Sequence, residues 1–303
     1  MAVSDVLVVS DAVSDALASG RPLVALETSV LAQGLPRPHN LEAAASMSKA
    51  IRAAGAEPAW VWVHRGRLRV GAGDVELERL ATADEVMKVA RRDLPMALAT
   101  EAVGATTVSA TVWAGRAAGI EVAATGGIGG IHPGSGDVSA DLLELARTAG
   151  TLVCAGPKSI VDPFATLERL EELGIGVVGL RCSKLPFFLV REAPIDVEHR
   201  AETVSDLAAM AAARAALGVE STLLVCTPIP EEDALPAEEV ERAVSHCLTK
   251  ADREAIRGKA VTPFLLSCLA DATQGRSITA NLALLENNAA VAAEVAMALH
   301  SGQ

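Results

Sequence analysis

Apolar runs and longer amphipathic segments alternate along the chain. Six short apolar runs that end in Gly or a polar turn predict strands at residues 22–30, 58–63, 120–127, 151–156, 175–182 and 221–230. Segments with helical periodicity lie between them, most of them closing on Gly, at residues 40–55, 141–150, 162–174 and 204–218. This alternation predicts a three-layer α/β/α fold with a large, mostly parallel central sheet, in which ligands bind at the carboxyl ends of strands. No linker divides the chain, so one domain over residues 1–303 is expected.

Composition narrows the possible partners. The chain has 303 residues, 50% of them hydrophobic, which is enough for a substantial core. Its net charge of −12, an aromatic content of 2% and the lack of Tyr disfavour binding to nucleic acid or to an anionic membrane. The sequence shows neither a signal-peptide pattern nor an apolar run approaching the length of a spanning helix, so a soluble, cytoplasmic protein is expected.

The cysteines also indicate a cytoplasmic protein. The five cysteines lie far apart, their number is odd, and none forms a C-x-x-C pair. Neither a disulfide framework nor a zinc site is therefore predicted, which fits a reducing cytoplasm.

A carboxylate stands where a strand is predicted to end. Glu27 follows an apolar strand and precedes Thr28, Ser29 and a Gly-Pro turn. That position suits a general acid at the carboxyl end of the sheet. A solvated Glu, or one that caps a neighbouring helix, is the alternative on these residues alone.

Two segments offer candidate anion sites. Lys88, Arg91 and Arg92 would share one helix face if residues 86–95 are helical. A solvated basic face paired with nearby carboxylates is equally compatible with that pattern. Residues 104–113 supply hydroxyls near a probable helix start, where backbone N–H groups favour an anion, although such residues are usually caps.

Residues 125–142, TGGIGGIHPGSGDVSADL, form a Gly-rich loop followed by a helix start. Its spacing matches neither the dinucleotide fingerprint nor the P-loop, so a nucleotide cofactor is not indicated. Asp137 and Asp141 beside His132 could hold Mg²⁺ or Mn²⁺ with most of its waters. N-capping by Asp137 or Ser139 explains the same residues without a ligand.

A lysine follows the next predicted strand. Lys158 stands after a Gly-Pro turn where a helix is expected to begin, in a chain with 20 Arg and only six Lys. A partly buried amine at a helix N-terminus has its charged form disfavoured, which prepares a nucleophile. Arg cannot take this role. An exposed Lys in a turn is the alternative.

Nine blocks, in this order, resemble the pseudouridine-5′-phosphate glycosidase family, also called indigoidine synthase A-like. They span about residues 14–299: VALETSV, VMKVARRDLP, GATTVSAT, ATGGIGGIH, DVSADL, VCAGPKSI, TPIPE, GKAVTPFLL and SITANLALLENNA.

The resemblance implies a Mn²⁺-dependent α/β/α homotrimer of pseudouridine catabolism. It would reversibly cleave the C–C glycosidic bond of pseudouridine 5′-phosphate, giving uracil and ribose 5-phosphate. It also implies that Lys158 is the nucleophile, forming a Schiff base with the sugar C1′, that Glu27 is the proton donor, and that Asp137 is the metal ligand. The substrate-binding positions it implies are Lys88, Thr107, Val108, Thr125, His132, Ser139, Ala140, Asp141 and Asn281.

The chemistry of that reaction explains the residue types. The leaving atom is uracil C5, a carbon without a lone pair, so acid assistance alone is a poor route. An amine at C1′ provides an electron sink as an iminium. The Gly-rich loop is then expected to surround the substrate while the helix after it positions the carboxylates.

Two alternatives use the same residues. A sugar-phosphate aldolase or an N-glycosidase would also need a Schiff-base Lys and a phosphate site. A catalytically silent ligand-binding protein of the same fold is compatible with Gln33, where a His is common in the family, and with Pro133, where a basic residue often stands.

Overall fold

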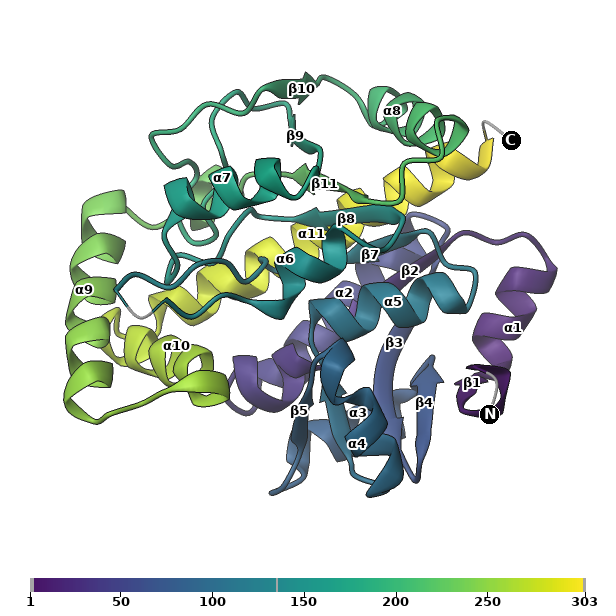
Figure 1. Cartoon of the computed structure of the whole chain (residues 1–303), viewed down its shortest axis with the longest axis horizontal. Coiled ribbons are helices and arrows are strands. Elements are labelled where there is room, and N and C mark those ends of the chain that lie inside the picture. Colours follow the sequence, from purple (N-terminus) through teal and green to yellow (C-terminus); the bar gives the residue numbers. More distant parts are fainter. Residues whose placement is uncertain (1–2, 135, 302–303) are drawn as a thin grey trace.

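All strands of the computed structural model, which describes residues 3–134 and 136–301, belong to one sheet (Figure 1). Nine of them follow the order β1 (Leu7–Val9), β4 (Arg67–Val70), β3 (Glu57–His64), β2 (Leu23–Glu27), β7 (Val122–Ala124), β8 (Gly150–Cys154), β11 (Thr222–Cys226), β9 (Val177–Leu180) and β10 (His199–Ala201). Two more, β5 (Met87–Val89) and β6 (Gly104–Thr106), are attached through β3.

The sheet is mostly parallel and buried on both faces. All five residues of β2 are buried, as are those of β8 and β11, which is why these strands appear in the sequence as continuous apolar runs. Antiparallel pairing occurs where β3 meets β4 and β6. The predicted fold class, with a mixed but mainly parallel sheet, is therefore confirmed.

Helices cover both faces (Figure 1). One apolar core packs the sheet against α1 (Asp11–Ala18), α4 (Leu94–Ala99), α5 (Val108–Ala117), α6 (Ala140–Leu145) and α7 (Pro163–Glu172). The other packs it against α2 (His39–Ala53), α3 (Asp74–Thr82), α8 (Val204–Ala216), α9 (Ala237–Arg253), α10 (Val261–Ala272) and α11 (Arg276–Ser301).

The regularity of α2 shows how the sequence produces these layers. Its buried apolar residues Ala43, Ala44, Met47 and Ile51 follow helical spacing, so they form one stripe that faces the sheet. α11 has such a stripe as well and packs against α2, α8 and β7. By length and composition alone α11 could cross a membrane, but its buried stripe makes it a core helix of this fold.

The strand order reverses beside β2. From β2 the chain proceeds to β3 and β4 on one side, whereas β7, β8 and β11 extend the sheet on the other. Such a switch point leaves a crevice at the carboxyl ends of the two diverging strands. β2 and β7 pair in parallel, so the loops after both strands meet at this edge.

Two expectations from the sequence were wrong. Residues 86–93 form β5 and the short 3-10 turn Arg91–Asp93 instead of a helix, because Lys88 pairs with β6 in the sheet. Cys247 and Cys268 form a disulfide between α9 and α10, whereas no disulfide was expected. Cysteine spacing could not indicate that these two helix faces meet, with Cα atoms 5.7 Å apart.

Candidate active site

Glu27 ends β2 with its carboxylate buried at the switch point. Thr125, just after β7, donates its hydroxyl hydrogen bond to Oε1, and Ser29 Oγ donates to Oε2 at 2.5 Å. Each carboxylate oxygen thus has one hydroxyl donor. These two contacts fix the orientation of the carboxyl group, which lines a cavity at this edge of the sheet.

Lys158 lies where the hydrogen bonding between β7 and β8 continues beyond the strands. Its backbone N–H donates to the carbonyl of Ile128 at 3.0 Å, and Nζ donates to the carbonyl of Gly127 at 2.7 Å. Since α7 begins only at Pro163, Lys158 stands in the preceding turn rather than at a helix start as predicted. A backbone carbonyl, not a helix N-terminus, holds the amine.

Close packing explains two glycines of the Gly-rich loop. A Cβ atom on Gly129 would lie 2.2 Å from Ser139 Oγ, and one on Gly130 would lie 2.3 Å from Thr166 Oγ1. Neither residue has a positive φ. These two glycines therefore let the loop pack closely against its own neighbours in the protein, while Gly126, Gly127 and Gly129 also line the cavity.

Asp141 joins three elements around the cavity. Its Oδ1 accepts the backbone N–H of Ser109 on α5 at 3.2 Å, and its Oδ2 accepts that of Gly129 at 3.0 Å. Ser139 is the N-cap of α6 and accepts the backbone N–H of Asp141. The carboxylate of Asp141 is thus occupied by backbone donors, and the residue positions the loop.

Lys88 projects from β5 into the same cavity. Burial lowers the pKa of its ammonium, and the nearby positive charge of Lys158 lowers it further, while Asp141 and Glu27 oppose the shift. Lys88 thus loses its proton more readily than an exposed lysine.

His132 and Asp137 face the cavity from the end of the Gly-rich loop. The backbone N–H of His132 donates to the carbonyl of Asp137 at 2.9 Å. Burial lowers the pKa of the imidazole; Lys158 and Lys88 act in the same direction, and Asp137 opposes them. The imidazole is therefore neutral at neutral pH.

The carboxylates and the imidazole of the cavity limit how a divalent metal could bind. Within residues 3–134 and 136–301, no group of three or more His, Cys, Asp or Glu side chains is arranged to hold an ion. A carboxylate such as that of Asp137 suits a hard cation that keeps most of its coordination sites for water or substrate oxygens. The residues fit Mn²⁺ or Mg²⁺ bound in that way and do not fit a fully protein-ligated site.

Ten of the twelve predicted site residues line one cavity of about 160 Å³. They are Glu27, Lys88, Thr107, His132, Asp137, Ser139, Ala140, Asp141, Lys158 and Asn281. Thr125 and Val108 do not line it: Thr125 is buried behind Glu27, and Val108 is buried in the first turn of α5.

Other residues in or beside the cavity are not assigned a role in the site from the sequence; of these, Arg92 appears there only as part of a basic cluster and Ser29 only as a neighbour of Glu27. Lys259 and Arg92 bring additional positive charge to the wall, and Ser29 orients Glu27. Asn288 on α11 donates to the carbonyls of Thr125 and Gly126 at 2.8 and 3.1 Å. These two hydrogen bonds anchor the start of the Gly-rich loop to α11. A residue count could have drawn attention to Lys259, because lysine is scarce in this chain.

The arrangement brings an amine, a carboxyl group and a cluster of cations to one enclosed space. Lys158 can attack an electrophilic carbon, and Glu27 can exchange a proton with the same ligand. The cations suit a ligand with an anionic group, such as a phosphate ester. These properties favour covalent chemistry on a small phosphorylated molecule.

Known sequences that match this chain include enzymes that act, according to their names, on a phosphorylated nucleoside. Residues 12–298 match the family described as Indigoidine synthase A like protein. The pseudouridine-5′-phosphate glycosidase of Myxococcus xanthus is 50% identical over 293 residues, covering 95% of this chain and 97% of the relative. That of Symbiobacterium thermophilum is 46% identical over 298 residues, covering 96% and 97%.

Solved structures share the architecture. The prealnumycin C-glycosynthase AlnA, in complex with ribulose 5-phosphate, superposes with a TM-score of 0.90 at 40% identity, covering 98% of each chain. An indigoidine synthase A-like protein from Thermotoga maritima has a TM-score of 0.90 at 37% identity, covering 97% of each chain.

Proposed function

The chain belongs to the indigoidine synthase A-like family. We propose that it reversibly cleaves the C–C glycosidic bond of pseudouridine 5′-phosphate, giving uracil and ribose 5-phosphate. The main support is that Lys158 and Glu27 line the same cavity, one after β8 and the other at the end of β2. The names of the relatives supply the substrate.

Ring opening is the first step. The C1′–O4′ bond breaks as O4′ takes a proton from Glu27, and the uracil ring then holds C1′ by an exocyclic C5–C1′ double bond. The N1 proton of uracil passes to the Glu27 carboxylate, which restores the acid. The amine of Lys158 then adds to C1′, and its nitrogen gives up one proton, which returns to uracil N1. Thr125 and Ser29 hold the Glu27 carboxyl group for this transfer.

Bond cleavage follows from the amine at C1′. The nitrogen lone pair forms the C1′ iminium while the C1′–C5 bond breaks, and uracil C5 takes a proton from Glu27, which regains one when water attacks C1′. Water then adds to C1′, releasing ribose 5-phosphate and the Lys158 amine. The sum is pseudouridine 5′-phosphate plus water giving uracil plus ribose 5-phosphate.

Substrate binding uses the cations and helix ends around the amine. Lys88 contributes a positive charge to the 5′-phosphate, and the first turn of α5, entered through Thr107, offers backbone donors. His132, Ser139 and Asn281 provide polar contacts along the same wall.

Mn²⁺ is proposed as the cofactor, held by Asp137. Asp141 is the weaker candidate for a direct ligand, because backbone N–H groups occupy both of its oxygens. A bound divalent ion would supply positive charge to substrate oxygens. Chelation should abolish activity and Mn²⁺ should restore it; full activity of Asp137→Ala in chelator would disprove this assignment.

A cytoplasmic homotrimer is proposed as the working form. Val138, Leu143 and Phe164, on or beside the helices that follow β7 and β8, expose 45%, 46% and 55% of their surface, and apolar exposure of this kind is suited to a subunit contact. Light scattering at micromolar concentration should give the trimer mass, and a monomer would contradict it.

The decisive experiment is incubation with pseudouridine 5′-phosphate and chromatographic detection of free uracil. Uracil released by the wild type and not by Lys158→Arg supports the proposal. An aldolase, an N-glycosidase or a silent ligand-binding protein would release none. Uracil with excess ribose 5-phosphate should run the reaction in reverse.

A further inference from the structure

The segment that joins α9 to α10, residues 254–260, forms an arm over one end of the cavity. Its 3-10 turn, Gly258–Ala260, carries Lys259 to the cavity wall. The first turns of α10 continue the same wall with Thr262, Pro263 and Leu266. The arm therefore contributes a charged group to a site whose other groups come mainly from strand ends.

Lys259 makes two contacts with the segment that follows β5. Its Nζ lies 2.8 Å from Asp93 Oδ2 and donates to the carbonyl of Lys88 at 3.2 Å. Asp93 is nearly buried and also accepts the backbone N–H of Ala90 at 3.0 Å. The ammonium of Lys259 is thus held directly beside the residue already assigned to the phosphate.

Among the residues that the structure describes, four cations and four carboxylates line this cavity, and two of the cations, Lys88 and Lys259, lie side by side near the arm. Lys88, Lys158 and Lys259 all line the cavity, and Arg92 stands at its rim. Lys259 lies close enough to Lys88 for its charge to lower the pKa of that residue. Asp93 offsets the charge of Lys259 in the ligand-free protein, and a phosphate dianion would be a further acceptor for the ammonium groups of both Lys88 and Lys259.

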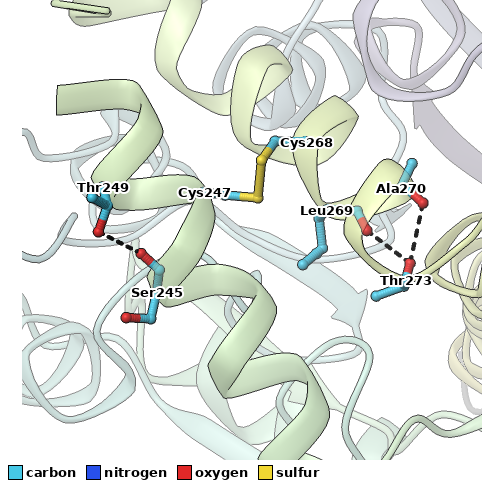
Figure 2. Close-up of a disulfide and its surroundings, with 7 residues drawn as sticks. All are labelled: Ser245, Cys247, Thr249, Cys268, Leu269, Ala270 and Thr273. Atoms are coloured by element: carbon cyan, nitrogen blue, oxygen red, sulfur yellow. Dashed lines mark hydrogen bonds between the residues drawn. A yellow bond between two sulfur atoms is a disulfide. The ribbon is translucent and has the colours of Figure 1, made fainter. Parts of the chain in front are cut away.

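The arm is braced against the loop that carries Lys158. The disulfide Cys247–Cys268 ties α9 to α10 (Figure 2). Both cysteines pack in one apolar cluster with Ile160 and Val161, just after Lys158. This cluster sets where the arm stands relative to the reacting amine.

We propose that Lys259 is a second cation for the substrate's 5′-phosphate, shared with Lys88 and delivered by the arm. The inference rests on the proposed function for the identity of the phosphate ester. In the ligand-free protein Asp93 holds the ammonium in place, and on binding a phosphate oxygen becomes an additional acceptor for it. The competing interpretation is that Lys259 and Asp93 only fasten the arm.

Two substitutions separate these interpretations. Lys259→Met removes the cation, and Asp93→Asn removes the ion pair while its amide oxygen can still accept the Ala90 N–H. Lys259→Met should raise the KM for pseudouridine 5′-phosphate about tenfold or more, the size of one lost charge-assisted hydrogen bond, with a smaller effect on kcat. Asp93→Asn should leave KM unchanged or lower it, because Lys259 is then freer to bind phosphate.

Lys184→Met is the matched control. Lys184 also pairs with an aspartate at 2.8 Å and has a similarly exposed side chain, 41% against 44%, but it does not line the cavity. Its substitution should not change KM. Lys259→Arg keeps the charge and should retain most of the affinity.

Titration of ribose 5-phosphate and of inorganic phosphate gives a readout independent of turnover. Both should bind less tightly to Lys259→Met than to wild type and Lys184→Met. Equal losses in Lys259→Met and Asp93→Asn, or no loss in either, would overturn the inference. If the wild type releases no uracil but the phosphate-binding difference persists, the proposed function fails and the role of Lys259 stands.

Discussion

The two sides of the cavity are built by different means. On the strand-end side, Glu27, Lys158 and Asp141 are each tied to neighbouring loops by hydrogen bonds. On the arm side, Lys259 is 44% exposed and held by Asp93 and one carbonyl.

This difference separates reaction from recognition. Bond making needs atoms fixed to within a fraction of an ångström, which a sheet edge with buried hydrogen bonds provides. Holding a phosphate needs charge at the right distance and tolerates a longer, more exposed side chain. We therefore expect changes on the strand-end side to reduce kcat and changes on the arm to act mainly through KM.

Lys158→Arg should have the largest effect, with no detectable cleavage. The change keeps the charge and approximate length but removes the amine that can lose its proton and form an iminium. Borohydride added during incubation of the wild type with ribose 5-phosphate should trap a sugar adduct, and peptide mass mapping should locate it on Lys158. An adduct on Lys88, Lys184 or Lys259 would place the chemistry elsewhere.

Glu27→Gln should lower kcat by about 10²- to 10⁴-fold, the usual contribution of a general acid. The amide keeps the shape of the side chain and removes its titration. Thr125→Val, which removes the hydroxyl donor to Oε1, should lower kcat by less because Ser29 still orients the group. Turnover near the wild-type level in Glu27→Gln would assign the proton to another residue.

Alkaline pH should weaken substrate binding through Lys88. Its pKa lies below the ordinary lysine value of 10.5, so the ammonium is present at low pH and is lost as pH rises through the lowered pKa. The phosphate, whose second pKa is about 6, stays dianionic across that range. KM should therefore rise on the alkaline side, by at most about tenfold per pH unit for one proton.

Lys88→Arg is the control for the expected rise in KM at alkaline pH. Arginine stays protonated there, so the alkaline rise in KM should disappear. A pH profile of KM that is the same in both proteins would exclude Lys88 as its source.

Loss of the disulfide should have the smallest effect on turnover. Cys247 and Cys268 are 21 residues apart, and a cross-link closing a loop of that size contributes about 3 kcal/mol to the free energy of unfolding. Cys268→Ala should lower that free energy in urea by this order and raise KM less than Lys259→Met does. Wild type treated with dithiothreitol should resemble Cys268→Ala, whereas peptide mapping that finds both thiols free would contradict the bridge.

Local patterns along the chain were enough to predict the layers of the fold and most of the site residues. The central strands are buried on both faces, so they had to be continuous apolar runs, and α2 had to carry an apolar stripe. Residues near strand ends, such as Glu27 and Lys158, were predicted at one edge because parallel strands bring their carboxyl ends together. The nine sequence blocks, in their order along the chain, indicated the indigoidine synthase A-like family.

Which side chains meet depends on how distant segments pack together, and local patterns do not show it. Thr125 donates a hydrogen bond to Glu27, which lies 98 positions away in the sequence. The carboxylate of Asp141 accepts hydrogen bonds from the backbone of α5 and of the Gly-rich loop. Lys88 belongs to a strand because β6 pairs with its segment, overriding a helical charge spacing. Lys259 and the disulfide depend on how α9 and α10 pack together, and local periodicity records which face of a helix is buried but not which partner it buries against.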